Sequence, residues 1–67
     1  MDEKALFDGC KMAFNSAKEG GYITELCGEV DIENNAYEIL QFGFEDVEEL
    51  TDGEFDKCVD ILKSFLK

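Results

Sequence analysis

The fold depends on residues 22–44, which read YITELCGEVDIENNAYEILQFGF. Four apolar residues near the start of this stretch have the i, i+3, i+4, i+7 spacing of one helix face. They are Ile23, Leu26, Cys27 and Val30. Asp31 can then cap a second helix that ends at Gly43. This pattern predicts two short helices in the middle of the chain.

The same stretch can also be interpreted as a β-hairpin over residues 29–44. Residues 29–32 and 36–44 would be its strands, and Asn34 and Asn35 would supply the turn, because Asn tolerates the left-handed backbone conformation. Residues 36–44 do not alternate cleanly between polar and apolar side chains, so the helical interpretation is favoured.

A helical pattern precedes this segment. Residues 2–19 place small and apolar side chains on one helix face, and Gly20-Gly21 supplies the backbone freedom that ends a helix. The face consists of Leu6, Cys10, Ala13 and Ala17, with Phe7 and Phe14 beside it. We expect a first helix over residues 2–19.

A second strong pattern follows. Thr51 and Glu54 have the spacing of a capping box, which predicts a helix from Asp52 to about Leu66. The predicted fold class is therefore mainly α, a small three- to four-helix domain with a helix-turn-helix-like middle. The alternative is an α+β fold with a hairpin at residues 29–44 between two helices.

Length and composition limit the class of protein. The 67 residues, 45% of them hydrophobic, suffice for one small folded domain over residues 1–67. Nothing in the sequence has the length of a membrane span or the pattern of an export signal, so we expect a cytoplasmic protein without membrane contact. Three Cys without any His make no zinc ligand set, and we expect reduced, buried thiols and no cofactor or metal.

The charge of the chain is segregated. Residues 21–56, here called the acidic segment, hold 12 of the 17 acidic residues and none of the 6 basic ones, in a chain of net charge -11. Ordinary soluble helices interleave lysines with their acids, so this segregation points to a surface for a basic partner.

Other chemistry has little support in the sequence. The chain has no His, no Arg and no Gly-rich phosphate loop, so we expect no enzymatic activity. A calcium loop with Gly53 at its sixth position would place Leu50 and Val59 at two ligand positions, which excludes an EF-hand.

Residues 23–40 resemble the helix-turn-helix motif of bacterial and phage regulators. Leu26 and Cys27 stand at an apolar and a small position of the motif, while its turn Gly is replaced by Asp31. The resemblance implies a small regulatory or protein-interaction module. Because the would-be recognition helix carries Glu33 and Glu38 and no basic residue, direct nucleic-acid binding is not expected.

In size, charge and lack of catalytic residues the chain resembles small phage-encoded inhibitors that imitate DNA, including anti-CRISPR proteins. Thr51-Asp52-Gly53-Glu54-Phe55 is also similar to the helix start of the small acidic immunity proteins that block nuclease toxins. These resemblances imply a non-enzymatic monomer or homodimer, in the host cytoplasm if phage-encoded, that blocks the nucleic-acid-binding surface of a basic protein or complex.

The expected partner-binding residues are exposed carboxylates of the acidic segment, spaced like phosphates if they lie on helices. They are Glu25, Glu29, Glu33, Glu38, Glu45, Asp46, Glu48, Glu49 and Asp52. Tyr22, Tyr37 and Phe44 are the expected aromatic anchors beside them.

Overall fold

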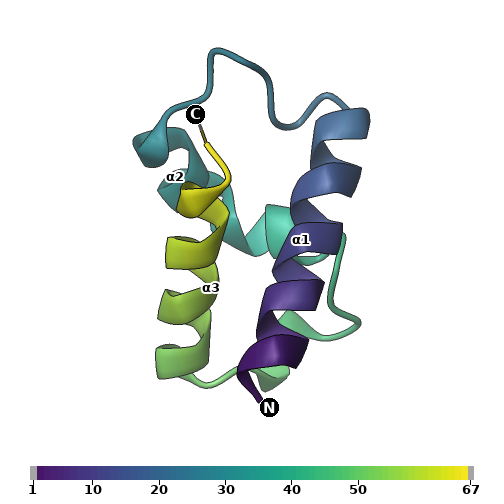
Figure 1. Ribbon diagram of the computed structural model, residues 1–67, viewed down its shortest axis with the longest axis vertical. Coiled ribbons are helices and arrows are strands. Elements are labelled where there is room, and N and C mark those ends of the chain that lie inside the picture. The colour runs from purple at the N-terminus through teal and green to yellow at the C-terminus, as the bar shows by residue number, and fades with distance from the viewer. Residues whose placement is uncertain (1, 67) are drawn as a thin grey trace.

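The computed structural model describes residues 2–66, and this range holds three α-helices and one short 3-10 helix (Figure 1). The elements are α1 (Glu3–Glu19), α2 (Glu29–Leu40), η1 (Val47–Glu49) and α3 (Asp52–Ser64). Helices α1 and α3 run side by side in the same direction, and α2 packs against both from behind (Figure 1). The prediction of a mainly helical small domain is confirmed.

Helix α1 ends where its sequence predicts and begins one residue later, with Asp2 as its N-cap. The Asp2 carboxylate accepts a hydrogen bond from the Ala5 amide at 2.7 Å and so caps the first turn. At the other end, Gly21 adopts a φ of +84°, and the Tyr22 amide donates to the Ala17 carbonyl at 2.8 Å. This is the Schellman ending that only glycine adopts without strain.

The helix predicted over residues 23–30 is absent from the structure, and its residues form turns and bends up to Gly28. Ile23 is buried, but Leu26 is 93% exposed and Val30 is 66% exposed. Gly28, rather than Asp31, is the N-cap of α2, and the Asp31 carboxylate accepts from the Gly28 amide at 2.9 Å. The helix-turn-helix-like segment therefore contains only its second helix.

The alternative hairpin at residues 29–44 is wrong, because residues 29–40 form one continuous helix. Asn35, expected in the turn, lies within α2 and donates its side-chain amide to the Asp31 carbonyl at 2.9 Å. That bond spans one helical turn, so Asn35 lies inside the helix and not in a turn between strands.

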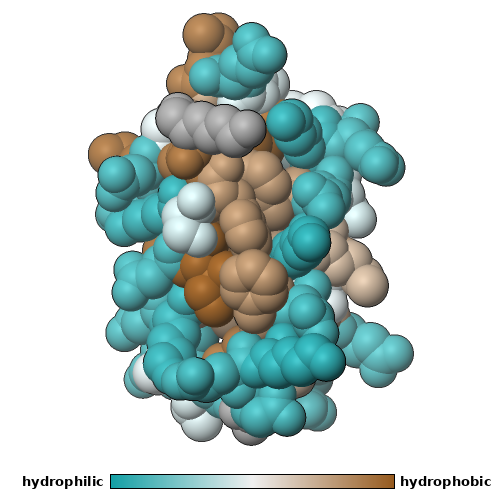
Figure 2. All heavy atoms as spheres, viewed as in Figure 1, coloured by the Kyte–Doolittle hydropathy of each residue, from teal (hydrophilic) through white to brown (hydrophobic). Residues whose placement is uncertain are grey.

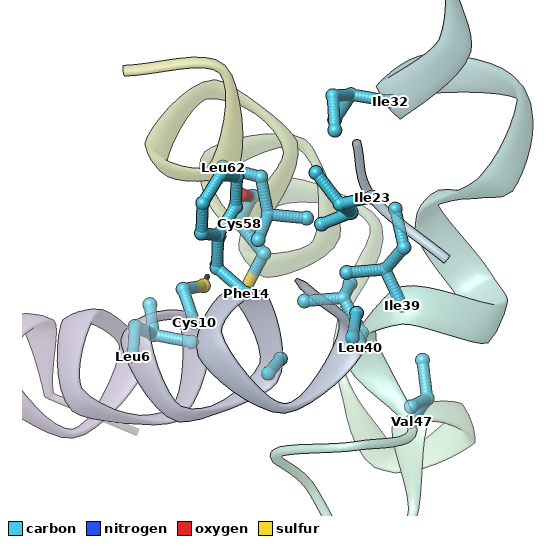
Figure 3. Close-up of a cluster of buried hydrophobic side chains, with 12 residues drawn as sticks. Leu6, Cys10, Phe14, Ile23, Ile32, Ile39, Leu40, Val47, Cys58 and Leu62 are labelled. Carbon is cyan, nitrogen blue, oxygen red and sulfur yellow. Dashed lines mark hydrogen bonds between the residues drawn. The ribbon is translucent and has the colours of Figure 1, made fainter. Parts of the chain in front are cut away.

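The core lies between the three helices (Figure 3). Its largest fully buried side chains are Ile32, Ile39, Leu40, Leu62, Cys10 and Cys58. The chain after α2 crosses α1 at close range, because a Cβ on Gly43 would lie 2.1 Å from the Gly9 carbonyl oxygen. Two glycines thus let the end of α2 pack directly on the backbone of α1.

Short capping elements connect α2 to α3. The Asp46 carboxylate accepts from the Glu48 amide at 3.0 Å and starts η1, which places Val47 in the core. Helix α3 ends at Ser64, two residues before the predicted end. Among residues 2–66, no helix has both the length and the apolar character needed to cross a membrane.

Candidate partner-binding surface

Every carboxylate predicted to bind a partner lies on an exposed residue. Helix α2 carries Glu29, Glu33 and Glu38, while Glu25 lies in the turn region before it. The remaining predicted residues, Glu45, Asp46, Glu48, Glu49 and Asp52, follow α2 through η1 to the first residue of α3.

The predicted row of acids along one helix is only partly present. Glu29 and Glu33 lie one turn apart on α2, but Glu25 is not part of that helix. Glu33 Oε1 also lies 2.5 Å from Nζ of Lys63 on α3, and this hydrogen bond raises the pKa of Lys63. Because Glu33 is already paired with Lys63 of the same chain, Glu29 and Glu33 on α2 offer less free negative charge to a partner than the sequence suggests.

The carboxylates after α2 converge more closely. Glu45, Asp46 and Glu49 line a hollow of about 360 Å³ at the surface, whereas the predicted residues Glu48 and Asp52 do not. Its lining consists of Phe44, Glu45, Asp46, Glu49, Leu50 and Glu54. We call this feature the acidic hollow. Its rim is anionic, while Phe44 and Leu50 supply apolar wall, which suits the aliphatic stem and charged head of a lysine or arginine side chain.

Capping hydrogen bonds at the start of α3 hold Glu54, one of the residues that line the acidic hollow. Thr51 is the N-cap of α3: its hydroxyl accepts from the Glu54 amide at 3.1 Å, and its own amide donates to Glu54 Oε1 at 2.9 Å. The bond from the Thr51 amide lowers the pKa of Glu54. Glu54 is therefore held in place and remains ionised at neutral pH.

Tyr37 joins α2 to η1 beside the acidic residues. Its phenol donates to Glu48 Oε1 at 3.3 Å, and its side chain is 40% exposed. Desolvation and the nearby charge of Glu48 raise the pKa of Tyr37. Of the expected aromatic anchors, Phe44 lines the acidic hollow and Tyr37 contacts Glu48, whereas Tyr22 packs edge-on against Phe42 with ring centroids 5.4 Å apart.

Sequence reasoning missed Glu54 and Leu50 as part of this surface. Glu54 belongs to the predicted capping box and to the acidic segment but not to the predicted partner-binding residues, and it lines the acidic hollow. Leu50 is half-buried directly before the cap residue Thr51. The sequence does contain a signal for Glu54, because the cluster of acidic residues that starts at Glu45 continues into the first turn of α3.

Two of the three thiols are buried as expected, whereas Cys27 is only half-buried. No group of three or more Cys, Asp and Glu side chains among residues 2–66 is arranged to hold a metal ion. Cys10 and Cys58 are fully buried, and burial raises the pKa of both thiols, which keeps them protonated and unreactive.

No protein-family model, curated protein or solved structure matches the chain.

Proposed function

We propose that this protein is a non-enzymatic binding protein whose acidic hollow receives lysine or arginine side chains of a basic partner. The observation that carries the proposal is the convergence of Glu45, Asp46, Glu49 and Glu54 around an apolar wall. No lysine or arginine belongs to residues 21–56, so Glu45, Asp46 and Glu49 have no basic residue close to them in sequence.

The most suitable partner is a protein that normally binds nucleic acid. Such proteins present rows of Lys and Arg to phosphates, and an ordered row of carboxylates competes for the same groups. Capping hydrogen bonds hold the carboxylates of Asp46 and Glu54, and Glu49 lies on η1, which fixes the spacing of these three acids at low entropic cost to the complex. Anti-CRISPR-type inhibition of a nuclease complex and immunity against a nuclease toxin both use this chemistry.

Long-range charge attraction and close contact make different contributions to binding. The net charge of -11 accelerates approach to a basic surface, while close contact in the acidic hollow gives specificity. Phe44 and Leu50 would contact the methylene groups of the bound cationic side chain. Binding should therefore weaken as added salt screens the charges.

A competition experiment tests the proposal. Basic nucleic-acid-binding proteins from the host are captured on the immobilised protein, and each is then purified and assayed for DNA and RNA binding. We expect the wild type to displace nucleic acid from its target and Glu45→Gln/Glu49→Gln to lose about tenfold or more in potency.

The matched control removes the same charge elsewhere. Asp8 and Glu19 are exposed acids of α1 that do not line the acidic hollow. Asp8→Asn/Glu19→Gln should retain most of the potency. Equal losses of potency in the two double variants would mean that net charge alone is responsible, which would contradict a role for the acidic hollow. Displacement of nucleic acid that does not depend on salt would also overturn the proposal.

A further inference from the structure

An apolar groove runs between α1 and α3 on the face shown in Figure 2, bordered by hydrophilic side chains. Its centre is an aromatic cluster in which Phe65 meets Phe7 and Phe14 edge-on, with ring centroids 5.6 and 5.3 Å apart. Phe7 remains 43% exposed, and Ile61 is half-buried beside it. The groove leaves large apolar side chains in contact with water, as unpaired interfaces do.

The groove opens into a hollow of about 540 Å³ at the start of α1. Lys4 and Phe7 line it from α1, and Asp60 and Ile61 line it from α3. The ion pair between Lys57 Nζ and Glu3 Oε1, 2.8 Å long, joins the two walls across this end. An apolar floor with ionic edges is the usual layout of a protein–protein interface.

Both walls of the groove carry charged side chains at their edges. Lys4, Lys11 and Lys18 recur every seven residues and form a row on α1 next to Phe7 and Phe14. Within residues 2–66 these three lysines make no ion pair. The opposite wall, on α3, presents Lys57 and Asp60, whereas Asp56 lines a separate hollow with Glu33 and Lys63. Where the two walls meet, each therefore carries both signs: Glu3 and Lys4 on α1, and Lys57 and Asp60 on α3.

The lysines of residues 2–66 all lie on α1 and α3. Two copies of a chain with net charge -11 repel each other through the acidic segment, and this repulsion is weakest where the lysines are. The α1–α3 face is therefore the surface through which two copies approach at least electrostatic cost.

We propose that this groove is the interface of a symmetric homodimer. A two-fold axis parallel to the helices would place α1 of one subunit over α3 of the other. Lys4 then lies near Asp60 of the partner subunit. Phe7 and Ile61 pack between the subunits, and both acidic hollows stay on the outside.

The size of the molecule limits the surface area that this dimer can bury. The structure measures 31 × 19 × 19 Å, so one long side offers an area of about 600 Å² before side-chain relief is counted. Stable interfaces bury about 800 Å² on each partner. We therefore expect an interface smaller than that of a stable dimer.

Sedimentation over a wide concentration range tests the dimer. The mass should rise with concentration from the 7.6 kDa of one chain towards twice that value. Phe7→Asp should weaken association by about tenfold or more. Leu26→Asp, the same kind of change at an exposed site outside the groove, should leave association unchanged. Circular dichroism verifies that each variant is folded.

A charge exchange tests the geometry. Lys4→Glu alone and Asp60→Lys alone each place like charges together and should weaken the dimer. An equimolar mixture of the two variants restores attraction at both contacts and should associate as the wild type does. Destabilisation of a subunit cannot produce this rescue, so the mixture separates an interface effect from a folding effect.

Other results overturn the proposal. These are a wild type that stays monomeric at every concentration, association that Leu26→Asp abolishes, or a mixture that fails to associate. If the monomeric wild type binds the anionic dye anilinonaphthalene sulfonate and Phe7→Asp does not, the groove is instead a site for an anionic amphiphile.

Discussion

The phenol of Tyr37 donates a hydrogen bond to Oε1 of Glu48 at 3.3 Å, and this contact ties α2 to η1. Eleven residues separate the two partners in sequence. The bond therefore brings the acids of α2 and those after it onto one ordered surface. Because nearby negative charge opposes loss of the phenol proton, the pKa of Tyr37 also reports the local negative potential.

We predict that Tyr37 titrates above its ordinary pKa of 10.0. Desolvation and the charge of Glu48 raise this pKa, so the associated stability is present below pH 10 and is lost as the pH rises through the raised value. Absorbance titration of Tyr22→Phe, which leaves Tyr37 as the sole tyrosine, measures it. Glu48→Gln should lower the midpoint, and Glu25→Gln, on the turn region before α2, should not.

We predict that Thr51→Ala lowers the free energy of unfolding by about 1 kcal/mol, because it removes the hydroxyl that caps the Glu54 amide. Urea unfolding at neutral pH measures the change. Ser at position 51 keeps a hydroxyl, so Thr51→Ser should retain most of the stability. A loss as large in Thr51→Ser would contradict the capping role.

The carboxylate of the same capping box predicts a pH dependence. The Thr51 amide lowers the pKa of Glu54, so its stabilising contribution is present above the ordinary value of 4.5 and is lost as the pH falls through the lowered value. Glu54→Gln should therefore be less stable than the wild type at pH 7, and the difference should shrink in acid. A constant difference across this range would contradict the prediction.

We predict that Gly43→Ala destabilises the protein by about 2–4 kcal/mol, because its Cβ would meet the Gly9 carbonyl oxygen at 2.1 Å and the Ala13 Cβ at 2.8 Å. Backbone must move to relieve that clash. Gly53→Ala is the matched control, since nothing lies within 4 Å of its Cβ and its position is helical. It should stabilise α3 by a few tenths of a kcal/mol to about 1 kcal/mol.

Two leucines provide a test of the core. Leu62 is fully buried and Leu26 is 93% exposed. We predict that Leu62→Ala costs about 2–5 kcal/mol, while Leu26→Ala changes stability by less than about 0.5 kcal/mol. Thermal unfolding of both variants measures the difference. Comparable losses would mean that residues 23–30 pack as a helix after all.

Both outer helices could be predicted from sequence because their signals are local and agree with one another. Leu6, Cys10, Ala13 and Ala17 mark the buried face of α1, and all four are buried in the structure. Thr51 and Glu54 predicted the start of α3, and both capping bonds are present. Periodicity and capping required no knowledge of the rest of the chain.

The middle segment could not be predicted in the same way. Ile23, Leu26 and Val30 have helical spacing, but Gly21 and Gly28 leave too few residues between them for a stable helix. Three helices already enclose the core, so only Ile23 finds a place inside. Tertiary packing decides which apolar residue is buried, and the spacing of residues in the sequence does not reveal it.

The acidic surface was predictable as a composition but not as a geometry. The sequence indicated which segment carries the charge, and it misplaced Glu25 on a helix. It could not show that Lys63 occupies Glu33, because 30 positions separate them. Nor could it show that Glu54 joins Glu45 and Glu49 around one hollow, since that depends on how η1 leads into α3.

The burial of two of the three thiols gives the protein a built-in reporter of its own opening. Cys27 is half-buried at the surface, whereas Cys10 and Cys58 lie on facing helices with no exposed area. An alkylating reagent should modify the folded chain at Cys27 first, and a second or third adduct should appear only in molecules whose α1 and α3 have separated. The distribution of adducts in a mass spectrum would then count opened molecules directly, in a sample that needs no added label.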